Sequence, residues 1–142
     1  MMRTVLKSKI HRAKVTAAEL EYSGSLTLDP DIMQAADMLP FEKVLVVNFN
    51  NGARIETYLI VGEKGSGTVC LNGPAARLGM LGDIVTIMSF AVVEDSEARG
   101  LQPKIVYVDE RNRVKEVKVG SIHDESSLDA QNPQKRRISR RG

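Results

Sequence analysis

The sequence has few of the residues from which metal centres and nucleophilic triads are usually built. Its 142 residues include one cysteine, Cys70, and two histidines, His11 and His123. A His/Cys metal site needs three or four such ligands, and Cys70 stands in an apolar, strand-like run typical of a buried, inert thiol. A Ser-His-Asp triad would depend on His11, and the Gly-x-Ser-x-Gly elbow is missing. We therefore expect no metal and no conventional triad.

The single cysteine also leaves no partner for an intramolecular disulfide, which agrees with a reducing compartment. The N-terminal residues show no apolar segment followed by a small-residue cleavage site, and the longest apolar run, residues 84–93, is far shorter than a bilayer span. These features predict a cytoplasmic protein that does not associate with membranes.

Aromatic residues and net charge are scarce as well. Tryptophan is absent, and aromatic residues make up 4% of the chain. Residues 1–118 carry 15 Lys or Arg and 15 Asp or Glu, whereas residues 119–142 carry 5 and 3, so the formal net charge of +2 comes from the last segment. Because residues 1–118 have no net charge and few aromatic side chains, they are poorly suited to bind a phosphate backbone or to stack on bases. Nucleic acid is not an expected partner.

The chain is rich in short β-branched segments that are separated by glycine-containing turns. Asn51-Gly52 predicts a type I′ hairpin turn, and Asp29-Pro30-Asp31 predicts the start of a helix with Leu39 on its apolar face and Pro40 at its end. Extended segments are predicted at residues 3–9, 13–16, 43–48, 54–61, 68–71, 84–93, 103–109 and 114–119. This pattern indicates a mainly β protein, a small closed or nearly closed barrel with short helices. Residues 1–118 form the predicted domain, and residues 119–142 a polar, basic, disordered tail.

The bond between Gly24 and Ser25 is a candidate for self-cleavage. Glycine has no side chain to shield its carbonyl and reaches backbone angles that are closed to other residues. The Ser25 hydroxyl can attack the Gly24 carbonyl and convert the peptide into an ester, and elimination followed by hydrolysis would leave a pyruvoyl group. Such a ketone supplies an electron sink that side chains lack. On these residues alone, an ordinary polar turn is the simpler interpretation.

Five separated blocks of the sequence together resemble the aspartate 1-decarboxylase family, the pyruvoyl-dependent enzymes of pantothenate synthesis. The blocks are Lys9–Thr16, Tyr22–Ser25, Asn51–Tyr58, Asn72–Arg77 and Gly82-Asp83. Five blocks in the right order at matching spacing are hard to obtain by chance, and the resemblance covers roughly residues 1–108. It reverses the interpretation of Gly24-Ser25 from a turn to a cleavage site.

The resemblance implies a six-stranded double-psi β-barrel that assembles as a homotetramer with active sites between neighbouring protomers. It implies a proenzyme that cuts itself between Gly24 and Ser25, a pyruvoyl group made from Ser25 that forms a Schiff base with the substrate, and the conversion of L-aspartate to β-alanine and CO2. Because this cofactor is covalent and self-generated, the resemblance implies neither a metal nor PLP.

The resemblance also assigns roles to single residues. Tyr58 matches the proton donor, and Thr57 and Asn72 match residues that support processing. The substrate-binding residues that it implies are Lys9, Arg54, Thr57, Gly73, Pro74 and Ala75, with Lys9 and Arg54 facing the substrate carboxylates. Pro74 departs from the family, which commonly has alanine there, so one backbone N–H is lost from the substrate-binding turn.

The residue types fit these roles. The Arg54 guanidinium can hold a carboxylate through paired hydrogen bonds, and Thr57 and Asn72 are candidates to polarise the Gly24 carbonyl while Ser25 attacks it. Two alternatives stay open. One is an uncleaved β-barrel that acts as a binding or interaction module, with its basic tail on an anionic partner. The other is a decarboxylase of a different acidic amino acid.

Overall fold

The computed structural model describes residues 1–120 of the chain, so His123 and all of the predicted tail except residues 119 and 120 lie outside the described residues. The elements are β1 (Met2–Lys14), β2 (Ala17–Glu19), β3 (Ser25–Leu28), α1 (Pro30–Ala35), β4 (Lys43–Asn48), β5 (Arg54–Val61), β6 (Val69–Asn72), the 3-10 helix η1 (Gly73–Arg77), β7 (Ile84–Glu94), α2 (Asp95–Ala98), β8 (Lys104–Val108) and β9 (Val114–Val119). Among these, no helix is long and apolar enough to cross a bilayer.

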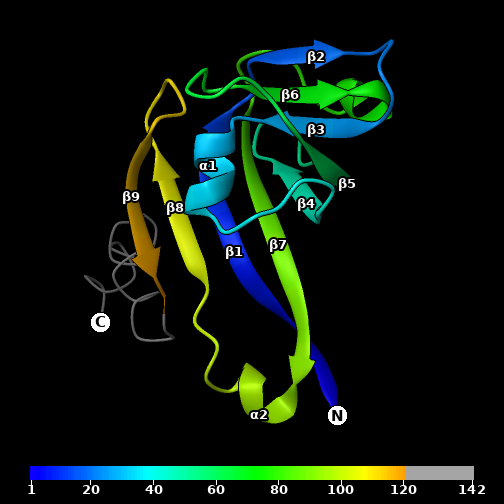
Figure 1. Cartoon of the computed structure of the whole chain (residues 1–142). Coiled ribbons are helices and arrows are strands. Elements are labelled where there is room, and N and C mark those ends of the chain that lie inside the picture. The colour runs from blue at the N-terminus through cyan, green and yellow to red at the C-terminus, as the bar shows by residue number, and fades with distance from the viewer. Residues whose placement is uncertain (121–142) are drawn as a thin grey trace, which may run out of the picture.

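The strands are hydrogen-bonded in the order β2-β6-β3-β5-β4-β7-β1-β8-β9. The two longest strands, β1 and β7, run antiparallel along the molecule, while β2, β3 and β6 lie together at the end opposite α2 (Figure 1). The predicted mainly β, barrel-like fold is confirmed. The six-strand count is not, because residues 1–120 contain nine strands, including the three-residue β2 and the C-terminal hairpin of β8 and β9.

The extended segments predicted at residues 3–9 and 13–16 are one continuous strand up to Lys14. β1 pairs with β7 through two register shifts, one between Leu6 and Ser8 and one between Ile10 and Ala13, and Arg12 has a φ of 58°. A β-bulge inserts an extra residue into one strand while the ladder continues beyond it. The polar stretch between the two apolar segments is therefore an irregularity within β1, not a break in it.

Helix α1 begins as predicted but ends earlier. The Asp29 side chain caps it by accepting a hydrogen bond from the backbone N–H of Asp31 at 2.9 Å, and Pro30 lies in the first turn. The prediction that the helix reaches Leu39 is wrong, because Asp37 has a φ of 54°, a left-handed conformation that stops a helix. Leu39 is 64% exposed as a result, whereas Met38 is 3% exposed and packs in the core.

Strands β4 and β5 form the predicted hairpin with the predicted bounds, but its turn is not type I′. That turn needs positive φ at both central residues, and of Asn51 and Gly52 only Gly52 has it, at 75°. The backbone N–H of Asn48 donates to Ala53 at 2.9 Å, and the Asn48 carbonyl accepts from Gly52 at 2.9 Å. The Asn48 side chain also accepts from the backbone of Asn50 at 2.8 Å. These hydrogen bonds stabilise a loop that is longer than two residues.

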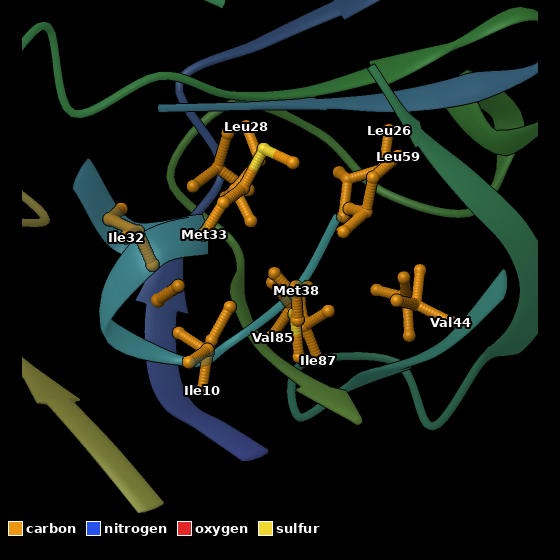
Figure 2. Close-up of a cluster of buried hydrophobic side chains, with 14 of the residues drawn as sticks. Ile10, Leu26, Leu28, Ile32, Met33, Met38, Val44, Leu59, Val85 and Ile87 are labelled. Carbon is orange, nitrogen blue, oxygen red and sulfur yellow. The ribbon is translucent and has the colours of Figure 1, made fainter. Parts of the chain in front are cut away.

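The core lies between α1 and the strands of the barrel. Helix α1 contributes Ile32 and Met33, which face the buried side chains of the sheet (Figure 2). The large side chains that are fully buried on the strands include Ile10, Leu26, Leu28, Val44, Leu59 and Ile87. Burial of a side chain of this size stabilises the fold by roughly 1.5–3 kcal/mol. Because Leu26 and Leu28 are among them, β3 is fixed firmly at the residues that follow Ser25.

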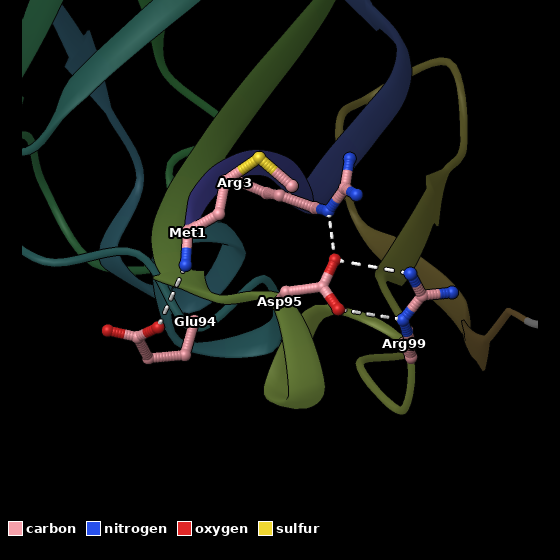
Figure 3. A network of polar contacts seen from close by, with 5 residues as sticks. All are labelled: Met1, Arg3, Glu94, Asp95 and Arg99. Carbon is pink, nitrogen blue, oxygen red and sulfur yellow. Dashed lines mark hydrogen bonds and ion pairs between the residues drawn. The ribbon is translucent and has the colours of Figure 1, made fainter.

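An exposed polar network joins the start of β1 to α2 (Figure 3). The N-terminal ammonium of Met1 lies 3.6 Å from a carboxylate oxygen of Glu94, and Asp95 accepts hydrogen bonds from both Arg3 and Arg99. The hydrogen bonds from Arg99 and then Arg3 lower the pKa of Asp95. These contacts fix the end of the β1–β7 pair, although exposed ion pairs contribute little to stability.

Asp29 is the buried charge that connects α1 to the turn after β5. It is 2% exposed, and its carboxylate accepts from the backbone N–H groups of Gly67 at 2.8 Å and Gly65 at 3.1 Å besides that of Asp31. Burial raises the pKa of Asp29, but the hydrogen bonds from Gly67, Asp31 and Gly65, together with the charge of Arg113, lower it further than burial raises it. The carboxylate is therefore ionised and stabilises the fold.

We expect Asp29→Asn to lower the free energy of unfolding by about 1–3 kcal/mol at neutral pH, because it removes a charged acceptor from buried N–H donors. A carboxylate with a lowered folded-state pKa contributes stability above its unfolded pKa of about 3.9 and loses it as the pH falls through the folded value. The difference between variant and wild type should thus shrink in acid. Urea unfolding across a pH series measures it, with Asp31→Asn, whose partner is the exposed Lys64, as the control. Equal losses in the two variants would contradict the assignment.

Candidate functional site

Ser25 lies where three distant segments of the chain meet. It is the first residue of β3 and is 1% exposed. On one side β3 runs antiparallel to β6, which places Ser25 opposite Asn72. On the other side β3 runs parallel to β5 with Leu26 opposite Leu59, the residues that directly follow Ser25 and Tyr58. Strand pairing alone therefore brings the segments 24–25, 57–58 and 72–73 to one place.

The Asn72 side chain is the centre of the polar contacts at this place. Its Nδ2 donates to Ser25 Oγ at 3.0 Å and to Thr27 Oγ1 at 2.8 Å, and its Oδ1 accepts from the Cys70 thiol at 3.3 Å. The Ser25 hydroxyl lies 3.4 Å from the Ser23 carbonyl, to which it donates. Asn72 thus contacts the hydroxyl that would attack the backbone, and its expected action on the Gly24 carbonyl stays a prediction.

The turn after β6 packs directly on the backbone of the predicted cleavage site. Gly73 has a φ of +62°, and a Cβ at this position would lie 2.6 Å from the Tyr22 carbonyl oxygen and 2.8 Å from the Gly24 nitrogen. Pro74 approaches from the same side, since its Cδ lies 3.4 Å from where a Cβ of Gly24 would be. Only glycine permits this backbone conformation and this close approach together. Ala75 is 2% exposed in η1 beyond them.

The other predicted site residues lie on strands at increasing distance from Ser25. Thr57 and Tyr58 are on β5 beside β3, and Tyr58 is 39% exposed. Arg54 begins the same strand and is exposed, roughly 13 Å from Tyr58 along the chain at the rise of an extended strand. Lys9 is on β1, which the strand order separates from β3 by β5, β4 and β7. Within residues 1–120, neither cation is among the hydrogen-bond partners of Ser25.

Two members of the site were missed in the sequence. Thr27 and Cys70 both bind the Asn72 amide, and each lies two residues from a predicted site residue on the same strand. The available signal was the alternation of side chains along a strand, which places residues two apart on one face. Cys70 is 7% exposed, and burial, together with the charge of Glu19, raises the pKa of its thiol. The predicted buried thiol is confirmed.

His11 lies outside the contacts of Ser25, where β1 pairs with β8 and His11 is opposite Tyr107. Its ring packs edge-on against Tyr107 with the centroids 5.5 Å apart, and burial, Lys9 and Arg12 lower its pKa. The two rings line a groove of about 320 Å³ with Lys14 and Lys115. Within residues 1–120, no three His, Cys, Asp or Glu side chains are placed to hold a metal ion together.

Comparison with known proteins gives a consistent result. The family model described as aspartate decarboxylase matches residues 1–115. A protein named aspartate 1-decarboxylase from Leptospira biflexa is 63% identical over 116 residues, which cover 81% of this chain and 98% of that relative. Proteins of the same name from Pelotomaculum thermopropionicum and Listeria monocytogenes are 55% and 58% identical, covering 91% and 80% of this chain and 98% and 90% of theirs.

The packing of Gly73 can be tested by adding one methyl group. We expect Gly73→Ala to lower the free energy of unfolding by about 3 kcal/mol or more, because the strain of a left-handed alanine adds to a clash with the backbone at residues 22–24. Gly52→Ala is the matched control, since Gly52 has a φ of +75° and nothing within 4 Å of the new Cβ. It should cost about 1–2 kcal/mol from strain alone. Urea unfolding compares the two variants, and equal costs would show that the close contact at Gly73 is unimportant.

Proposed function

Since this chain belongs to the aspartate decarboxylase family, we propose that it cuts its own backbone between Gly24 and Ser25 and decarboxylates L-aspartate with the pyruvoyl group that results. The products are β-alanine, for pantothenate biosynthesis, and CO2. The observation that carries the proposal is the placement of the buried Ser25 hydroxyl, which Asn72 binds at 3.0 Å while Gly73 packs on the adjoining Gly24.

The surroundings of Ser25 fit a small neutral ketone. Ser25 is 1% exposed, and its side chain binds the Asn72 amide, which in turn binds a hydroxyl and a thiol whose raised pKa keeps it protonated. A pyruvoyl group carries no charge, so this environment imposes no cost for a buried ion. The Asn72 amide supplies a hydrogen-bond donor to an oxygen at the position of Ser25 Oγ. We take Asn72 and the Gly73 turn as the residues that would hold the group.

Self-cleavage needs two changes at the backbone. In the first, Ser25 Oγ loses its proton and bonds to the Gly24 carbonyl carbon, the peptide C–N bond breaks, and the freed amine of Ser25 takes up a proton. An ester now joins the two residues. In the second, loss of a proton from the Ser25 Cα breaks the Cβ–Oγ bond, which releases Gly24 as a carboxylate. Water then replaces the nitrogen of the resulting dehydroalanine, and ammonia leaves. Thr57, on the neighbouring strand β5, is our candidate to polarise the Gly24 carbonyl.

The substrate reaction uses the residues around this point. A pyruvoyl group made from Ser25 would supply an electron sink for the pair that loss of CO2 from the substrate releases. Tyr58 has its hydroxyl available, since the side chain is 39% exposed on the strand beside Ser25, and we assign it the return of a proton to the α-carbon. Arg54 and Lys9 are assigned to the substrate carboxylates, Arg54 through paired hydrogen bonds. Since Pro74 has no N–H, backbone contacts to substrate at that turn fall to Gly73, Ala75 or a carbonyl.

We further propose a homotetramer with active sites between neighbouring copies. The support is that β1, which carries Lys9, is separated from β3 by three strands in the strand order, an arrangement that suits a site to which a neighbouring copy contributes. Large exposed apolar side chains are available to form the interfaces. Those more than 60% exposed include Leu39, Phe41, Met80, Leu81 and Val92. A cytoplasmic location is proposed from the lone, buried thiol of Cys70.

A denaturing mass spectrum tests the central proposal. We expect purified active protein to give pieces of 24 and 118 residues, with the larger one starting at a ketone that reacts with a hydrazine. Ser25→Ala is the control and should stay a single chain of 142 residues without decarboxylase activity. An active sample that consists of one intact chain with an unmodified serine would exclude the pyruvoyl mechanism and leave the uncleaved binding module as the explanation of the fold.

Tyr58→Phe separates turnover from processing. Since the change removes one hydroxyl from a half-exposed side chain, we expect normal cleavage but a fall in kcat of about 100-fold or more, the usual contribution of a positioned proton donor. Tyr22→Phe, which alters another exposed tyrosine beside the cleavage site, is the control and should keep normal turnover. β-Alanine release per cleaved chain is the quantity to measure, and wild-type release from Tyr58→Phe would remove Tyr58 from the mechanism.

A further inference from the structure

We propose that Thr27 and Cys70 are positioning residues for self-cleavage, because together they fix the orientation of the Asn72 amide that binds Ser25. The inference rests on the proposed function and adds two residues to it. Neither residue touches the bond that breaks. Their effect is to decide which end of the amide, the nitrogen or the oxygen, faces the serine hydroxyl.

The four side chains form one arrangement on the paired strands β3 and β6. In the antiparallel register Ser25 is opposite Asn72 and Thr27 is opposite Cys70. Side chains two residues apart on a strand share a face, so Ser25 and Thr27 project together, as do Cys70 and Asn72. Hydrogen bonds join Asn72 to the other three, at 3.0 Å to Ser25, 2.8 Å to Thr27 and 3.3 Å to Cys70. The group is thus set by strand register alone.

The Asn72 amide at the centre of this group can adopt two orientations. A half-turn about its last bond would point Oδ1 at Ser25 and Thr27 and Nδ2 at Cys70. In that orientation both amide hydrogens would face a sulfur atom, which is a poor acceptor, and the amide oxygen would draw the hydroxyl protons of Ser25 and Thr27 toward Asn72. In the observed orientation Thr27 accepts one amide hydrogen, Ser25 accepts the other, and Cys70 donates to the oxygen. Burial, with the charge of Glu19, raises the pKa of Cys70 and so preserves this donor.

The orientation matters because negative charge develops on Ser25 Oγ twice. The oxygen first loses its proton as it attacks the Gly24 carbonyl, and later it becomes part of the carboxylate that leaves when the Cβ–Oγ bond breaks. An N–H that donates to this oxygen stabilises both charges, whereas an amide oxygen in its place would repel them. The observed orientation also leaves the serine proton directed at the Ser23 carbonyl, 3.4 Å away, and not at Asn72. Residues that hold the amide this way favour cleavage.

The test follows the cleavage rate of freshly purified full-length precursor by mass spectrometry. Thr27→Val keeps the shape of the side chain and removes the acceptor, and Cys70→Ala removes the donor. Each should slow cleavage about fivefold, the rate equivalent of one neutral hydrogen bond. Cys70→Ser restores a donor and should cleave at close to the wild-type rate.

Val69→Ala distinguishes positioning from loss of packing. Val69 is fully buried next to Cys70 on β6, so its truncation should lower Tm at least as much as Cys70→Ala while leaving the cleavage rate unchanged. The inference is overturned if Cys70→Ala and Thr27→Val cleave at the wild-type rate, or if Val69→Ala slows cleavage as much as they do. Wild-type precursor that never cleaves would instead reject the proposed function, so the two failures can be told apart.

Discussion

The pairing of β3 with β6 is the constraint on which the proposed site depends. One antiparallel register sets Ser25 opposite Asn72 and Thr27 opposite Cys70, and the chain then turns at Gly73 back onto Gly24. A shift by one residue would send each of these side chains to the other face of the sheet. Such a shift would also move Leu26 and Leu28 out of the core, where both are fully buried. The hydrophobic core therefore enforces the register, and the register assembles the polar group.

The rest of the fold holds β3 at both ends. After Leu28, the Asp29 carboxylate joins the start of α1 to the turn at residues 65–67 through three backbone hydrogen bonds. Before Ser25, the backbone of residues 22–24 lies against Gly73, where there is no room for a Cβ. A reaction in which a side chain attacks its own backbone depends on positioning more than on strong acids or bases. Rigid support on both sides of a single peptide bond is suited to that task.

The charged residues of the proposed site are placed differently from the neutral ones. The group around Ser25 is complete within one chain and consists of an amide, hydroxyls and a thiol. Lys9 and Arg54, in contrast, lie on partly or fully accessible stretches of β1 and β5 and are not among the hydrogen-bond partners of Ser25. Under the proposed function, this division suits a protein that first modifies itself within the folded chain and then binds a substrate with two carboxylates at accessible cations.

What the sequence by itself determined was local. The bounds of β4 and β5 and the Asp29 cap follow from β-branched runs and capping residues, each readable within a few positions. The candidate bond at Gly24-Ser25 is distinguished from an ordinary turn only by the five sequence blocks taken together. Only the tertiary structure decided that α1 stops before Leu39, that β1 continues through two bulges, and that Thr27 and Cys70 join Asn72. Asn72 and Ser25 are 47 positions apart, and their contact depends on a strand register that packing of the whole core selects. Local preferences cannot specify such a register, because it is selected by the simultaneous burial of many side chains from distant parts of the chain.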